Sequence, residues 1–301
     1  MRIIKLETAI PEEETEKRWK GVQLQEDPSW TILREDADVY EPDGTLLARL
    51  RVKAIPDSIC RKAYPVFSEM NSLATNRGTA GGSGLMQDAS NRFGASNTRR
   101  VDPKFAGISG IAGYFDRYVR YPYCRETAFT ADQPARWEAI LPYVQRVSEV
   151  FRKTVPDRWA AQKAICDKTR PEWIIPGTVF TTVTINKNWQ SACHYDAGDY
   201  EPGFGVAAVL RAGNYTGGHL VLPGFGVGFD LWTGDVVCYA VHRLHGNTPF
   251  LGKLGTYRRI SAILYYRTNM HRCGTPEEEL KRARNRKPGD PIWDEKEKGN
   301  G

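Results

Sequence analysis

The sequence predicts an α+β fold that is mainly β, in which short strands form a sandwich or barrel flanked by helices. β-Branched and aromatic runs, separated by turns that contain Gly or Asn, recur through residues 178–266. A helical hydrophobic pattern begins at Ala135. No apolar run approaches the roughly 18–20 residues that a membrane span needs. With 41% hydrophobic residues, the 301-residue chain can instead bury a sizeable core.

The N-terminal region predicts a charged extension followed by a hairpin. Residues 1–30 are polar and charged, and we expect a helix around Glu12–Trp19 and then a linker. The next residues alternate as strands do, and a Pro-Asp-Gly turn at 42–44 lies between two such runs. Asp-Gly flanked by strand-like runs is a strong hairpin signal. The strand-like runs are 30–33, 38–40 and 46–52.

The centre of the chain predicts helices and the C-terminal half predicts strands. Four apolar residues at 3.6-residue spacing place one helix face after Ala135, and a second helix follows at 159–167. The four are Ile140, Val144, Val147 and Phe151. The expected strands are 178–185, 206–210, 218–222, 227–231, 235–240 and 260–266. Residues 271–301 carry eight basic and seven acidic residues, which predicts a charged helix or solvated tail.

Charge and cysteine usage set weaker limits. The net charge of +6 is compatible with a polyanionic partner without establishing one. The six cysteines are scattered without a C-x-x-C pair, so we expect free thiols and no disulfide framework or zinc site. The first residues lack the apolar stretch of a signal peptide, so an intracellular protein is expected.

A metal site is predicted in the strand-rich half, where four of the five histidines lie. His194 and Asp196 are two residues apart, so on a strand both side chains point to the same face. A histidine from a later strand would complete the two-histidine, one-carboxylate set of non-haem Fe(II) oxygenases. Alone, the H-x-D pair is commonly just a solvated pair. His245, followed by Gly-Asn at a strand end, is favoured over His242 as the third ligand.

An anion site is predicted 14 residues after His245. Open iron sites of this kind commonly take 2-oxoglutarate, whose distal carboxylate needs a fixed cation in the barrel. Arg259 offers a bidentate fork, and Ser261 faces the same way two residues later. Arg258 points to the opposite face and lacks such a serine.

At this point the chain resembles the TET/JBP family of Fe(II)/2-oxoglutarate dioxygenases, which oxidise the 5-methyl group of pyrimidines in nucleic acid. The resemblance covers roughly residues 35–275 and has the compact form of the phage and microbial branch, without the cysteine-rich region of animal TET enzymes. The segments that carry it are 180–187, His194-x-Asp196, 203–205, 217–223, 234–235, 245–248 and Arg259-Ile260-Ser261, with 76–80, 114–117 and 124–128 ahead of them.

The resemblance implies a double-stranded β-helix (jelly-roll, cupin-like) core at about 178–266 within a single dioxygenase domain of residues 31–270. It implies His194, Asp196 and His245 as the iron ligands and catalytic centre. It further implies Arg259 and Ser261 as the 2-oxoglutarate anchor, with O2 as the oxidant. Asn186 is a further candidate for the cofactor or base, although a strand-end hydrogen bond explains it equally well.

The same resemblance implies DNA, with the methylated pyrimidine flipped out of the stack, as the partner. Asp199 matches a position that contacts the flipped base. A carboxylate there accepts from the amine of cytosine, which favours 5-methylcytosine over thymine; alternatively, Asp199 caps a turn. A substrate-binding loop is expected at about 74–113, and the candidate substrate contacts are Arg77, Gly78, Arg99, Arg100 and Arg125. An ordinary solvated loop, or a salt bridge from Arg125 to Glu126 or Asp116, is the simpler reading.

The function predicted is therefore hydroxylation of a 5-methylpyrimidine in DNA by a monomer without membrane association. A cytoplasmic location, in a bacterium or a phage host, is favoured over a nuclear one. Two rivals remain open. One is a 2-oxoglutarate-dependent hydroxylase of a protein side chain or small metabolite, and the other is a non-catalytic jelly-roll binding module. Phe204, Phe225 and Tyr200 are available to stack on a base.

Overall fold

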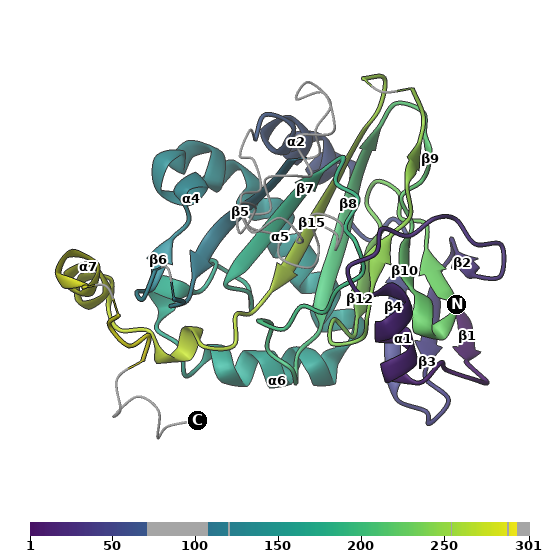
Figure 1. Cartoon of the computed structure of the whole chain (residues 1–301). Coiled ribbons are helices and arrows are strands. Elements are labelled where there is room, and N and C mark those ends of the chain that lie inside the picture. The colour runs from purple at the N-terminus through teal and green to yellow at the C-terminus, as the bar shows by residue number, and fades with distance from the viewer. Residues whose placement is uncertain (71–107, 120, 254, 288, 294–301) are drawn as a thin grey trace.

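A computed structural model describes residues 1–70, 108–119, 121–253, 255–287 and 289–293. Two facing sheets with helices on the outer side make up this part of the chain (Figure 1). The predicted fold class, an α+β chain with a jelly-roll core and flanking helices, is thus confirmed. No helix in these ranges is both long enough and apolar enough to span a bilayer.

Nine strands of the described residues form the major sheet, and all neighbours except β1 and β3 are antiparallel. In spatial order they are β1 (Arg2–Lys5), β3 (Ala37–Tyr40), β4 (Leu46–Arg51), β12 (Val236–Tyr239), β8 (Gly205–Ala212), β15 (Arg258–Tyr265), β7 (Thr182–Lys187), β5 (Ile108–Phe115) and β6 (Arg125–Glu126). The first and last of these strands therefore lie at opposite edges of one sheet.

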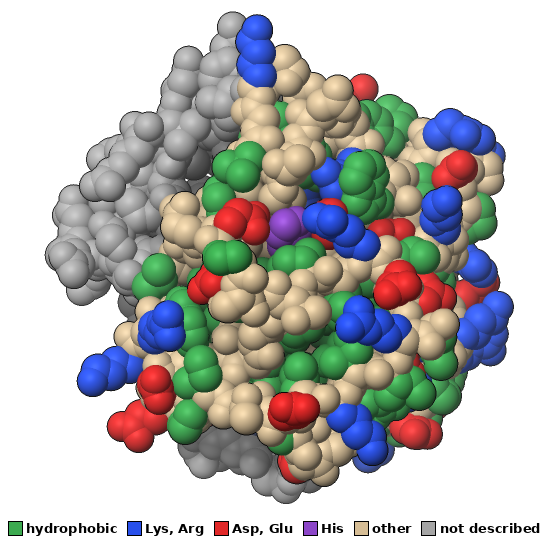
Figure 2. All heavy atoms as spheres, turned by 90° about the vertical axis from the view of Figure 1, so that its right-hand side faces the viewer, with side chains coloured by type: hydrophobic (Ala, Val, Ile, Leu, Met, Phe, Trp, Pro, Cys, Tyr) green, Lys and Arg blue, Asp and Glu red, His purple; other side chains and the backbone are tan. Residues whose placement is uncertain are grey.

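A smaller sheet faces the major one. It contains β13 (Gly246–Asn247), β10 (Leu220–Leu222), β11 (Val227–Phe229) and β2 (Thr31–Leu33), and a separate pair is β14 (Phe250–Leu251) with β9 (Thr216–Gly217). On the side of the molecule that bears this sheet, basic and acidic side chains are interspersed (Figure 2). The predicted hairpin is present as β3 and β4, with Gly44 at φ 90° in its turn. The strand expected at 178–185 begins later, at Thr182.

Helices cover the outer face of the major sheet. α5 (Pro134–Thr154) buries the four apolar residues whose spacing predicted it, and α6 (Pro156–Cys166) is the second predicted helix. α2 (Asp57–Ser68) and α4 (Ala128–Asp132) pack against α5. α7 (Pro276–Asn285) lies beyond the β6 edge (Figure 1). Short 3-10 turns occupy Pro171–Trp173, Pro223–Phe225 and Met270–Arg272.

The alternation of side chains along β8 explains the two layers. Val206, Ala208 and Leu210 join the core under α5, whereas Ala207 and Val209 join the core between the two sheets. Because successive strand residues point to opposite faces, both faces of this strand are apolar and both are covered. β7 and β15 use the same alternation to place polar residues toward the space between the sheets.

Residues 1–30 are not the extension that the sequence predicted. α1 (Glu12–Trp19) is the expected helix, but β1 pairs with β3, and Trp19 and Leu24 are buried with Cys193 and Val221. Ile4 and Leu6 also pack against the core between the sheets, and these tertiary contacts are not apparent from the charged composition of the segment. α7 is the charged helix that the sequence predicted for the tail.

The expectation of free thiols is wrong at two positions. Cys124 and Cys273, 149 residues apart, form a disulfide that joins the start of β6 to the segment before α7. Cys60, Cys166, Cys193 and Cys238 are free and buried. Two cysteines so far apart in the chain leave no local spacing pattern, so the sequence did not predict this disulfide.

Candidate active site

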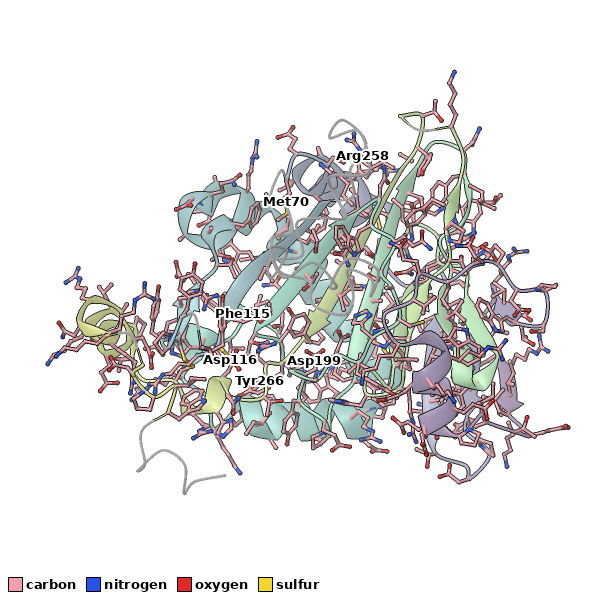
Figure 3. The ribbon with its side chains drawn as sticks, in the orientation of Figure 1. Met70, Phe115, Asp116, Asp199, Arg258 and Tyr266 are labelled. Atoms are coloured by element: carbon pink, nitrogen blue, oxygen red, sulfur yellow. A yellow bond between two sulfur atoms is a disulfide. The ribbon has the colours of Figure 1, made fainter. Side chains whose placement is uncertain are left out.

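A cavity of about 370 Å³ lies between the two sheets. Its walls come from the cavity-facing residues of β5, β7, β8, β12 and β15 and from residues 194–199 and β13. Figure 3 shows Phe115 and Asp116, at the end of β5, beside Asp199. Phe115 and Asp199 line the cavity near the end of β5, and Arg259 lines the cavity from β15.

Three of the lining side chains form the predicted trio. His194 and His245 are paired across an antiparallel bridge, with backbone N–H···O distances of 2.9 and 3.1 Å. Asp196 lies between the two rings: its Oδ1 is 3.2 Å from Nε2 of His194, and its Oδ2 is 3.4 Å from Nε2 of His245. One ligand atom from each residue lies within 4.8 Å of the others. His242 is not part of this group.

The backbone sets the tautomer of both rings. Nδ1 of His194 lies 2.8 Å from the carbonyl of Ala192, and Nδ1 of His245 lies 2.9 Å from the carbonyl of Arg243. A neutral imidazole that donates through Nδ1 keeps a lone pair on Nε2. Both Nε2 atoms face the Asp196 carboxylate: as protonated rings they donate to it, and as neutral rings they would present their lone pairs to a divalent metal.

Asp196 is held in its charged form. Burial alone would raise its pKa, but hydrogen bonds and charge from His194 and His245 outweigh this and hold the pKa well below its usual range. The Gly246 that follows His245 has a steric role, because a Cβ there would lie 2.9 Å from Sγ and 3.0 Å from the backbone N of Cys193. Only glycine lets the two histidine strands approach so closely.

Arg259 is a buried cation without an anion. Its side chain is 4% exposed and, among the described residues, makes no ion pair or hydrogen bond; the Phe250 ring lies 5.7 Å from Cζ. Burial lowers its pKa. The nearby carboxylate, Asp230, is already paired 3.0 Å from both Arg34 and Arg211. The charge of Arg259 is therefore left for a ligand, and a carboxylate matches it.

Asn188 holds Arg259 in place from the neighbouring strand. Its side-chain Oδ1 accepts from the backbone N of Arg259 at 2.7 Å, and its own N–H donates to the Arg259 carbonyl at 2.8 Å. Asn188 adopts the left-handed conformation at φ 50°, which Asn tolerates better than most residues. Ser261, also 4% exposed, lines the cavity from the same face as Arg259.

Asn186 lines the cavity and accepts a hydrogen bond from Ser109 Oγ at 2.6 Å. The strand-end hydrogen bond is therefore present, and a contact of Asn186 with the cofactor or the base stays a prediction.

Asp199 is also brought into the cavity, as predicted. It is 7% exposed, and its Oδ2 has no hydrogen-bond partner among the described residues. Burial and the charge of Asp196 raise its pKa, against the opposing effect of Arg267. Arg267 itself is paired with Asp116, with Nε and Nη2 at 3.0 and 2.9 Å from Oδ1. A Cβ at Gly198 would collide with this guanidinium, so any other residue there would have to displace the Arg267 side chain.

The remaining predicted contacts divide into two groups. Arg125 does not line the cavity and makes no ion pair with Glu126 or Asp116 in the described part of the chain; aromatic rings surround it instead. Arg77, Gly78, Arg99 and Arg100 lie outside the described residues, as does most of the expected 74–113 loop, and residues 108–113 are part of β5.

The three aromatic residues named as available for stacking lie away from the cavity. Phe204 and Tyr200 pack against the core under α5, and Phe225 packs between the sheets, so none lines the cavity. The aromatic lining residues are Phe115, Tyr195, Tyr239 and Tyr265. Of these, Tyr265 follows Ser261 on the cavity-facing side of β15, and that period of two was the available signal.

A jelly roll with two histidines and an aspartate around one point, and a buried unpaired arginine beside them, defines a 2-oxoglutarate-Fe(II) type of oxygenase. Residues 110–268 match the model of the Tet_JBP oxygenase domain of the 2OGFeDO superfamily. The chain belongs to this TET/JBP family.

Curated relatives and a solved structure agree with this assignment. Thymine dioxygenase JBP1 of Leishmania tarentolae is 37% identical over 272 residues, 87% of this chain. The JBP1 of Trypanosoma brucei brucei is 36% identical over 192 residues, 61% of this chain. The matches span only 30% and 22% of those relatives. The structure of NgTET1 in complex with 5mC DNA shares the fold, with TM-score 0.59, 13% identity, and coverage of 87% of this chain and 90% of that chain.

Proposed function

We propose that this protein is an Fe(II)/2-oxoglutarate-dependent dioxygenase that hydroxylates the 5-methyl group of a pyrimidine base in DNA. The observation that carries the proposal is the placement of the His194–Asp196–His245 trio and the unpaired Arg259 in a single cavity. A module that only binds a metal would need the three ligand residues but not the unpaired Arg259. A buried cation that lacks an anion beside it indicates a carboxylate cosubstrate.

The residues present fit both groups. His194, Asp196 and His245 would hold Fe(II) through two Nε2 atoms and a carboxylate, the donor set that leaves positions open for 2-oxoglutarate and O2. Arg259 and Ser261 would bind the distal carboxylate of 2-oxoglutarate. Together with O2, these groups supply the oxidising chemistry that hydroxylates a C–H bond. The protein fixes the ligand orientation through the Ala192 and Arg243 carbonyls.

The shape of the site explains why DNA would need to open. A methyl group inside a duplex cannot reach a point between two sheets, so the nucleotide must leave the stack. At the cavity end near Asp199, the side chains are Phe115, Asp199, Tyr265 and Arg267, which offer ring faces and polar edges to a base. The Tyr239 ring lies edge-on, 5.1 Å from the ring centre of His245, and helps to close the inner end.

Two observations bear on the base. The name of the JBP1 relatives supports thymine. The unpartnered Oδ2 of Asp199 supports the amine of 5-methylcytosine, as the sequence predicted. The substrate class we propose is therefore the 5-methylpyrimidine, and the experiment below includes both bases.

The test is mass spectrometry of nucleosides after incubation with Fe(II), 2-oxoglutarate and DNA that contains both 5-methylcytosine and thymine. We expect one base to gain one oxygen, and the product to be lost in Asp196→Ala and Arg259→Ala. The control Asp57→Asn, at the first turn of α2, should retain activity. Succinate without a modified base would support the protein or metabolite hydroxylase. Bound iron without succinate would support the silent binding module.

A further inference from the structure

The hairpin formed by β5 and β6 leads from the cavity to the edge of the major sheet. Its first strand ends at Phe115, which lines the cavity, and its turn is closed by two hydrogen bonds of 3.0 and 2.9 Å between Tyr118 and Tyr121. Val119 in the turn is 83% exposed. α7 flanks the outer side of this hairpin (Figure 1).

Arginines from the hairpin and from the residues after β15 and α7 lie against the aromatic rings of the hairpin. Cζ of Arg125 lies 5.0, 5.1 and 4.7 Å from the ring centres of Phe115, Tyr118 and Tyr121. Beyond them, Arg286 lies 5.7 and 5.2 Å from the rings of Tyr121 and Tyr123. The series starts at the cavity, where Arg267 stacks 4.3 Å from the Phe115 ring. We call these residues, with Val119, the hairpin strip.

Arg125 brings to the strip a charge that the carboxylates near it do not neutralise. Arg125 makes no ion pair within the described ranges, and its Nη1 is buried without a hydrogen bond there. Burial lowers the pKa of Arg125. A guanidinium group nevertheless keeps its charge in proteins. By contrast, Arg267 is committed to Asp116 and is not available to a phosphate.

We propose that the hairpin strip binds the nucleic-acid strand next to the base that occupies the cavity. The rings of Tyr118, Tyr121 and Tyr123 are half-buried, so each keeps part of its surface open to a base. Arginines between such rings match phosphates, which is how single strands are held without sequence preference. The strip is also continuous with the cavity through Phe115.

This inference rests on the proposed function, because the strand is that of the DNA substrate. Val119 is the residue to change, since its side chain points away from the packed hairpin. The chain offers a matched control in Ile3, which is 64% exposed on β1 at the opposite edge of the same sheet. Val119→Glu and Ile3→Glu change the net charge equally, so only the position differs.

The experiment measures binding of each variant to a fluorescein-labelled DNA duplex by fluorescence anisotropy at several salt concentrations, with base oxidation followed in parallel. We expect Val119→Glu to raise the Kd by about tenfold or more, and Ile3→Glu by less than about twofold. Arg286→Ala should remove about one phosphate contact and so lower the slope of log Kd against log salt by about one. Arg2 lies on β1 and pairs with Glu35, and Arg2→Ala should leave this slope unchanged. Melting temperatures identify any variant that fails to fold.

If Val119→Glu and Ile3→Glu have equal Kd values while wild-type protein still oxidises the base, the hairpin strip does not bind DNA and the proposed function stands. This is also the outcome expected if the strip serves an acidic protein instead. If wild-type protein neither bound nor oxidised any DNA, the proposed function would fall, and the hairpin strip with it.

Discussion

Single residues decide how closely the functional groups of this site are held. Asn188 and Gly246 are not among the proposed ligands of the metal or the cosubstrate, yet each positions a residue that is. Asn188 fixes the backbone of Arg259 through two hydrogen bonds, and Gly246 allows the His245 strand to approach Cys193. Both are positioning residues, and their effects can be separated from those of the ligands themselves.

Asn188→Gly should raise the KM for 2-oxoglutarate about fivefold with kcat little changed, because one backbone hydrogen bond contributes roughly 1 kcal/mol. Glycine keeps the left-handed conformation, so the backbone itself is not strained. Steady-state kinetics of succinate formation, with calorimetric titration of 2-oxoglutarate as a second readout, would measure it. Lys53→Gly, at the other left-handed non-glycine position among the described residues, is the control. A matching KM in both variants would contradict the role of Asn188.

Gly246→Ala should weaken divalent metal binding by about tenfold or more, since outer contacts that orient metal ligands have effects of this size. The added Cβ would push the His245 strand from Cys193 and separate the two rings. Equilibrium dialysis with Mn²⁺ as the probe measures this directly. Gly224→Ala, where a Cβ would instead crowd the Thr15 side chain, should bind Mn²⁺ as wild type does. Equal losses in both variants would point to general destabilisation.

At the scale of elements, α7 is attached to the β5–β6 hairpin by one buried carboxylate. Glu279 is 1% exposed and accepts hydrogen bonds from Arg117 Nε at 3.1 Å, from the backbone N of Cys124 at 2.7 Å and from that of Gly274 at 2.8 Å. A charged helix thus has a buried anchor, which a pattern of surface charge does not reveal.

Glu279→Ala should lower the free energy of unfolding by about 3–5 kcal/mol, because it leaves the Arg117 cation buried without this partner. Glu277→Ala, in the first turn of the same helix, should change it by less than about 0.5 kcal/mol. Urea denaturation followed by circular dichroism distinguishes the two. A small loss in Glu279→Ala would mean that α7 detaches without cost to the hairpin.

At the scale of the whole molecule, the cysteines report on long-range packing. The disulfide ties together segments 149 residues apart, and the four remaining thiols are buried. Burial raises the pKa of Cys60 to about 11 and the pKa values of Cys166, Cys193 and Cys238 to about 12. The thiolate is the reactive form, so these groups should be inert near neutral pH.

Alkylation with iodoacetamide at pH 8, read by intact-mass spectrometry, should therefore give close to no labels on the native protein. After unfolding without reductant, four labels are expected, and after unfolding with reductant, six. Six labels without reductant would show that Cys124 and Cys273 are free thiols in solution. The comparison uses protein purified without added reductant.

Much of the site followed from local spacing. The period of two along β15 places Arg259 with Ser261, and the 3.6-residue period predicted the buried face of α5. His194 and Asp196 also share the cavity, although Asp196 lies in the loop after the His194 bridge and not on a strand. The Gly-Asn after His245 chose it correctly over His242 for the trio. These features depend only on neighbours in the chain, and backbone geometry makes such neighbours share a face.

What only the tertiary structure decided are partnerships between distant residues. The Cys124–Cys273 bond, the pairing of Arg267 with Asp116, the rings around Arg125 and the burial of Trp19 join segments that no local period relates. By itself, the sequence determined the jelly-roll class and the chemistry of the ligands. Which aromatic and charged side chains border the cavity was decided by packing, because a side chain's surroundings are set by every strand that reaches it.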